Sequence, residues 1–65
     1  MQAKYFNDTD TLLINFSNHP IADTYDLNEN VLIEIGDKGN VVNMTFEHAK
    51  QQTDVTKFLY QLASV

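Results

Sequence analysis

The chain has 65 residues, of which nine are acidic and four are lysines, with no arginine and no cysteine. A chain of this length forms one domain, residues 1–65, and buries a small fraction of its surface, so we expect a second copy or a partner to add stability. The net charge of −5 repels phosphate and argues against direct nucleic-acid binding. No segment approaches the roughly 18 apolar residues that cross a bilayer, so we expect a cytoplasmic protein without a membrane partner.

The first quarter of the chain predicts a β-hairpin. Lys4 to Phe6 form a short strand that ends in the polar residues Asn7 to Asp10, whose side chains bond locally and favour a turn. Apolar residues then alternate at Leu12, Ile14 and Phe16. This period is typical of a half-buried strand, which we expect to pair with the first.

The next segment predicts an edge strand. Ser17 to Pro20 form a loop, because proline restricts the residue before it and has no backbone donor. Ile21 to Leu27 form a weaker strand with apolar and polar residues on both faces, which suits the edge of a sheet. Asn28 to Asn30 then form the turn into the following strand.

A second hairpin, Val31 to Ala49, organises the chain. The register that keeps its apolar residues on one face pairs Ile35 with Val42, Ile33 with Met44 and Val31 with Phe46. A slip of one residue would bury Asn43 and Thr45 without partners. The loop of this hairpin is Asp37 to Asn40, where Gly39 or Asn40 takes the positive φ that such a turn needs. Five short strands in succession predict an antiparallel meander.

After this hairpin the apolar period becomes that of an α-helix, with a stripe at Val55, Phe58, Leu59 and Leu62. Thr53 or Asp54 can cap the start of this helix. A helix of about eleven residues is marginal alone in water, so it must pack on something. Two alternatives stand: the helix covers one face of its own sheet, or it swaps onto a second subunit or presents its stripe to a partner. The fold class predicted is α+β, a five-stranded antiparallel meander with a C-terminal α-helix packed on one face.

The sequence contains no recognisable catalytic, cofactor or metal motif. Asp8 to Asp10 begin like a calcium loop, but Leu13 and His19 stand where that loop needs glycine and glutamate. His19 and His48 have no third ligand at a recognisable spacing, and surface exposure explains them better. The serines and carboxylates have no spacing typical of a nucleophile or an acid and base pair. We therefore predict no enzymatic activity and no bound cofactor.

Two stretches carry a family resemblance. Tyr5 to Phe16 resembles the opening pattern of the family called domain of unknown function 2283, small bacterial proteins in which a tyrosine precedes an acidic turn, an aspartate, a leucine and an alternating strand. Val31 to Ala49 is similar to the second half of that family, where an acidic glycine turn joins two strands and an alanine follows the last. The resemblance spans roughly Lys4 to Lys50. Phe6 and Leu13 stand where the family usually has aspartate and tyrosine.

The resemblance implies an antitoxin-like role, because members of that family are often encoded beside small toxins resembling RelE ribonucleases. An acidic chain is compatible with covering the basic surface on which such a ribonuclease holds RNA. We therefore expect a bacterial protein-binding module that forms a homodimer and takes a small basic protein as its partner. Exposed aromatics and the helical stripe are the expected contacts, namely Tyr25, Val55, Phe58, Leu59 and Leu62.

An alternative from a different class is a small ligand-binding or metal-binding domain. Its site would form at a homodimer interface from Asp8, Asp10 and one histidine. The sequence identifies neither the partner nor the substrate.

Overall fold

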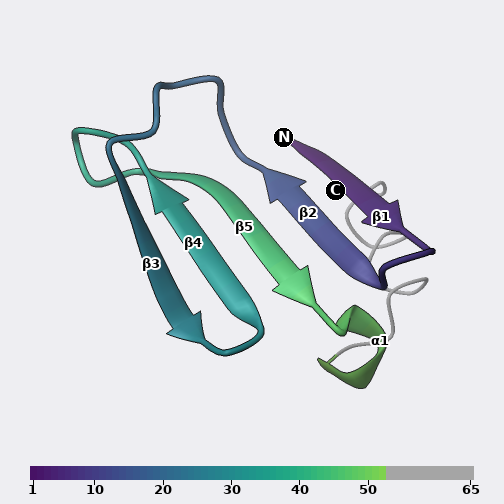
Figure 1. The fold of residues 1–65 in the computed structure, drawn as a ribbon. Coiled ribbons are helices and arrows are strands. Elements are labelled where there is room, and N and C mark those ends of the chain that lie inside the picture. The colour runs from purple at the N-terminus through teal and green to yellow at the C-terminus, as the bar shows by residue number, and fades with distance from the viewer. Residues whose placement is uncertain (53–65) are drawn as a thin grey trace.

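The computed structural model describes residues 1–52, which form one twisted antiparallel sheet followed by a short helix (Figure 1). The elements in chain order are β1 (Gln2–Phe6), β2 (Thr11–Asn15), β3 (Asp23–Asn28), β4 (Val31–Ile35), β5 (Val41–Glu47) and α1 (Ala49–Gln52). The predicted α+β class with five antiparallel strands is confirmed. Asn28 belongs to β3 rather than to the turn that follows it.

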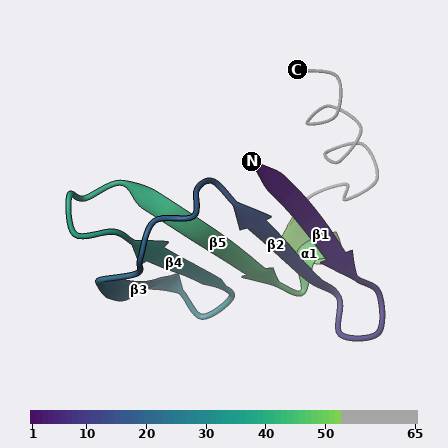
Figure 2. The same ribbon diagram turned by 90° about the horizontal axis from the view of Figure 1, so that it is seen from above.

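The strands do not pair in simple succession, because their order across the sheet is β1-β2-β5-β4-β3. β3, β4 and β5 form a meander, whereas β2 pairs with β5, so residues 16–22 cross the end of the sheet to reach its far edge (Figure 1). The physical reason lies in the side chains. Pairing β2 with β5 sets Leu12 opposite Phe46 and Ile14 opposite Met44, which joins two apolar strands in the middle of the sheet. β3 is left at the edge, as its mixed faces predict (Figure 2).

The predicted register of the β4–β5 hairpin is confirmed for two of its three pairs, Val31 with Phe46 and Ile33 with Met44. The third prediction is wrong: Ile35 pairs with Val41, because the register shifts after Glu34. Such an irregularity sets two residues of one strand against one of its partner. It leaves Val42 almost fully buried, with 2% of its surface exposed.

Two further observations explain why this register is held. On the polar face, the Asn43 amide accepts a hydrogen bond from Asn15 Nδ2 at 2.8 Å and donates to Glu34 Oε1 at 3.3 Å. These bonds satisfy the side chain that a slip of one residue would bury without partners. In the loop, the Gly36 N–H donates to the Asn40 carbonyl at 2.8 Å, and Gly39 takes the positive φ of 83°. Gly39 is confirmed as the left-handed residue of this loop. The predicted end of the loop at Asn40 changes with the register, because the bond from Gly36 to Asn40 closes the turn around residues 37–39.

The buried core lies over β1, β2 and β5. Leu12, Ile14 and Ala49 form its centre, with exposed fractions of 4% or less. Three partly buried residues pack against this centre: Ala3, Tyr5 and Phe46. All six residues of β3, at the other end of the sheet, are exposed. The apolar face is therefore buried over β1, β2 and β5 and exposed toward β3.

The helix predicted from Asp54 lies outside the described residues, as do its capping residue and its stripe of Val55, Phe58, Leu59 and Leu62. The described helix α1 is a single turn that directly follows β5. Within residues 1–52, no helix is both long enough and apolar enough to span a bilayer.

Candidate functional site

The turn between β1 and β2 is joined to α1 through Asp10. The Tyr5 hydroxyl donates a hydrogen bond of 2.6 Å to Asp10 Oδ1. The Lys50 backbone N–H lies 3.2 and 3.3 Å from the two oxygens of the same carboxylate, and the Ala49 N–H donates to the Asp10 carbonyl at 3.0 Å. A carboxylate that accepts N–H groups at a helix start is a favourable cap. Asp10, with a φ of 54°, is therefore a structural residue that fixes where α1 begins.

This arrangement raises the pKa of Tyr5 to about 12. The main cause is the hydrogen bond to Asp10, which is lost when the phenol ionises; burial and the negative charge of Asp10 act in the same direction. The Lys50 ammonium lies 6.0 Å from the centre of the Tyr5 ring. Tyr5 is consequently a protonated hydrogen-bond donor at neutral pH.

The described residues do not assemble the metal or ligand site considered for the sequence. Asp10 is engaged by Tyr5 and Lys50, while His19 lies 3.1 Å from Asn40 Nδ2 and His48 lies 3.0 Å from Asn30 Oδ1. Each histidine is thus held by a different asparagine. Within residues 1–52, no group of three or more His, Cys, Asp or Glu side chains is arranged to hold a metal ion.

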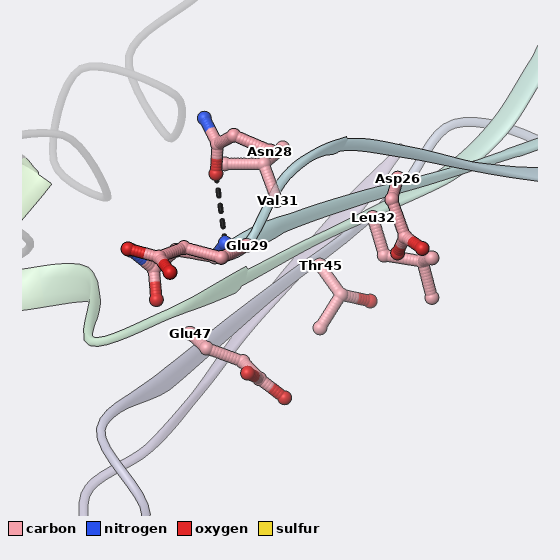
Figure 3. Close-up of a pocket in the computed structure, with 8 residues that line it drawn as sticks. Asp26, Asn28, Glu29, Val31, Leu32, Thr45 and Glu47 are labelled. Carbon is pink, nitrogen blue, oxygen red and sulfur yellow. Dashed lines mark hydrogen bonds between the residues drawn. The ribbon is translucent and has the colours of Figure 1, made fainter.

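A hollow of about 130 Å³ lies beside the β3–β4 turn (Figure 3). Its lining residues are Asp26, Asn28, Glu29, Asn30, Val31, Leu32, Thr45 and Glu47. A second hollow shares Glu29, Asn30 and Glu47 with it and also includes His48 and Gln51. The first hollow is smaller than the roughly 300 Å³ at which small-molecule pockets begin. The small volume makes this hollow a surface depression and not a ligand pocket. Its carboxylates give the depression a negative charge.

Sequence reasoning missed this group of carboxylates. Asp26 is opposite Leu32 of β4, and Leu32 is opposite Thr45 of β5, so three strands contribute to one patch. In Figure 3 the Thr45 and Glu47 side chains project from β5 on the same side of the sheet. The group can be found only from the register of β3, β4 and β5, because no spacing within one segment indicates it.

Tyr25 is the one predicted contact residue that the structure describes, and it lies on the edge strand. It pairs with Ile33 and has 52% of its surface exposed, while Leu27 in the same strand has 63% exposed. Ile21, in the loop that leads to β3, is also exposed. Within residues 1–52, β3 therefore exposes two large apolar side chains, and the loop before it exposes a third.

The charged residues of β3 and β4 are all acidic. The segment from Tyr5 to Asp37 contains no lysine or arginine. Its acidic residues are Asp8, Asp10, Asp23, Asp26, Glu29, Glu34 and Asp37. β3 and β4 thus combine exposed apolar groups with negative charge, which is a surface that attracts basic groups.

These features define a small single-sheet α+β protein with an open, acidic edge strand. The chain belongs to the family described as Protein of unknown function (DUF2283), whose model matches residues 2–50. The match covers all five strands and the start of α1, and it confirms the resemblance seen in the sequence. No curated protein and no solved structure matches the chain.

Proposed function

We propose that this protein is a non-catalytic binding module for a small basic protein, acting as an antitoxin-like inhibitor of a RelE-like ribonuclease. The observation that carries the proposal is the edge strand β3, where Tyr25 and Leu27 are largely exposed within an acidic surface. Tyrosine is enriched among the residues that dominate binding energy, because its large ring loses water while its hydroxyl keeps a hydrogen bond.

Charge gives the proposed inhibition its mechanism. A ribonuclease must hold the phosphates of RNA with lysine and arginine, and that interaction is predominantly electrostatic. A chain of net charge −5 that docks on this basic surface neutralises it and physically excludes the RNA. The inhibitor needs no catalytic group for this action.

The test begins with capture of the tagged full-length protein from its own cells, followed by intact-mass analysis of whatever elutes. We expect one small basic protein in a fixed ratio, with RNA cleavage activity that falls as this protein is added back. Cleavage that continues at a saturating ratio would overturn the proposal. The predicted homodimer is measured in the same preparation by sedimentation of the purified protein.

Two matched variants test the surface. Tyr25→Asp on β3 should weaken inhibition strongly, because it removes an aromatic contact and puts a hydrated carboxylate in the apolar part of the interface. Phe6→Asp on the other edge strand, at a residue with 45% exposure, makes the same charge change and should inhibit as the unmodified protein does. Equal inhibition by the two variants would show that Tyr25 and its edge strand do not decide binding.

The predicted contacts in the C-terminal stripe need a separate variant. Phe58→Ser in the full-length chain should weaken partner binding or dimerisation if that stripe is part of either interface. If partner binding and dimerisation are both unchanged, the stripe is not part of either interface, and the β3 surface remains the proposed contact.

A further inference from the structure

Building on the proposed function, we infer that β3 is a docking strand to which an extended basic segment of the partner pairs through its backbone. The segment would alternate basic and apolar residues and become a sixth strand next to β3. Addition of a strand to an open sheet edge is a recurrent mode of peptide recognition, in which backbone bonds give affinity and alternate side chains give specificity.

The two edges of the sheet differ in how open they are. Among residues 1–52, β3 has a neighbouring strand on one side only, and all six of its residues are exposed. β1 is the other edge strand, but its Ala3 and Tyr5 pack against the buried core. An edge strand presents a row of backbone N–H and C=O groups to a further strand. β3 is the better docking edge of the two.

One amide of this row already has a hydrogen-bond acceptor in the free protein. The Thr24 N–H donates to the carboxylate of the preceding residue, Asp23, at 2.8 Å. The Glu47 N–H donates to the Asn30 carbonyl, so the backbone groups of Ile33 in β4 point away from β5 and toward β3. Tyr25, which is opposite Ile33, therefore bonds toward β4, and alternation turns the N–H groups of Thr24 and Asp26 to the outer edge. A lysine or arginine that pairs with Asp23 would draw the carboxylate away and release the Thr24 amide for a backbone bond. The bond between Asp23 and the Thr24 amide therefore favours a basic segment over a neutral or acidic one.

The two faces of β3 specify the side chains of that segment. Tyr25 is opposite Ile33 on the apolar face, whereas Asp26 lines the acidic hollow together with Glu47 (Figure 3). Successive side chains of an added strand point to opposite faces. Its apolar residues would lie beside Tyr25, and its basic residues would lie over Asp26 and Glu47. Asp23 shares the face of Tyr25, so the basic residue that pairs with Asp23 would stand at the end of the segment.

A second copy of this chain does not fit the same edge. Pairing β3 with β3 of another copy would bring Asp23 and Asp26 of both copies into one seam. Like charges on adjacent strands destabilise the pairing. The register shift between Asp26 and Asn28 also disturbs a regular pairing of identical strands.

The test uses isotope-labelled full-length protein and a short peptide of alternating lysine and valine with one additional lysine at each end, so that a basic residue is present on both faces. We expect hydrogen exchange at the Thr24 and Asp26 amides to slow by about tenfold at a saturating peptide concentration, since both amides acquire an acceptor. One control peptide has glutamate in place of lysine. The other is N-methylated at every residue, which keeps the charge but removes all backbone donors. Neither control should slow exchange at these two amides.

Slowed exchange with the N-methylated peptide, or binding that leaves Thr24 and Asp26 unprotected, would overturn the inference. Asp23→Asn provides a variant that keeps an acceptor for the Thr24 N–H and loses the charge. It should bind the lysine peptide several-fold more weakly, whereas Asp37→Asn, an equal charge change in the exposed β4–β5 loop, should not. Equal weakening in both variants would also contradict the inference.

The two proposals can fail separately. If a basic ribonuclease is captured and inhibited while the β3 amides stay unprotected, the proposed function stands and the docking strand is wrong. If the peptide protects β3 but no captured protein is inhibited, the docking strand stands and the proposed function is wrong.

Discussion

The hydroxyl of Tyr5 and the carboxylate of Asp10 form a hydrogen bond of 2.6 Å that joins β1 to the turn before β2. The same carboxylate accepts the backbone N–H of Lys50, next to Ala49, which is fully buried. Three segments of the chain are thus fixed to one another at a single side chain. In a sheet with few buried residues, such a junction holds the start of α1 on the core.

Replacement of Asp10 tests this junction. Asp10→Ala should lower the free energy of unfolding by about 1–2 kcal/mol, because it removes a cap and leaves a β-carbon at positive φ. Asp10→Asn should cost clearly less, since the single oxygen of asparagine can still accept from Tyr5 and Lys50 and asparagine tolerates the left-handed region. Urea unfolding of both variants measures the difference. Equal stability of the two variants would show that the junction does not depend on the acceptor.

The raised pKa of Tyr5 predicts a pH dependence at the alkaline end. Because the folded protein holds this proton more tightly than the unfolded chain does, the contribution of Tyr5 to stability is complete below pH 10 and is lost as the pH rises through about 12. Absorbance titration of tyrosinate should show a late step that Tyr5→Phe removes. Tyr25→Phe is the control and should leave that step in place; a late step that survives Tyr5→Phe would contradict the assignment.

Burial predicts a sharp contrast between two leucines. Leu12 has 1% of its surface exposed, so Leu12→Ala should cost about 2–5 kcal/mol, which is comparable to the whole stability of a domain this small. Leu27, with 63% exposed, loses little burial, so Leu27→Ala should stay within about 0.5 kcal/mol. Thermal unfolding by circular dichroism compares the two. A folded, stable Leu12→Ala protein would place the core elsewhere.

The β4–β5 loop offers a test of backbone conformation without a change in packing. A β-carbon on Gly39 would meet no atom within 4 Å, so the cost of Gly39→Ala is that of the φ of 83° alone, about 1 kcal/mol. Gly39→Asn should cost less, because asparagine populates this region more readily. Chemical denaturation separates the two variants. An alanine that is as stable as glycine would mean that the loop can adopt a different turn.

Local patterns predicted each strand and its partner within a hairpin. Alternation in Leu12 and Ile14 and in Val31, Ile33, Met44 and Phe46 fixed which face is apolar, and two of the three pairs in the β4–β5 hairpin followed from that. The shift at Ile35 was missed, because it leaves Val42 without a cross-strand partner in β4 and buried, and no alternation within the two strands indicates this. The sequence pattern drew attention to Asp8 to Asp10 only as a calcium-like start, and the structural use of Asp10 as a cap for α1 was not foreseen.

The α+β class, the hairpins, the apolar face and the acidic charge could be predicted without a structure, because they depend on residue type and on periods of a few residues. Three relationships required the folded chain: β2 lies beside β5, Asp10 accepts from Tyr5 and Lys50, and Asp26, Glu29 and Glu47 share one hollow. Each of these relationships joins segments distant in the chain, and several arrangements satisfy the same local pattern. The choice among them is made by burial of the whole apolar face, which no single segment can report.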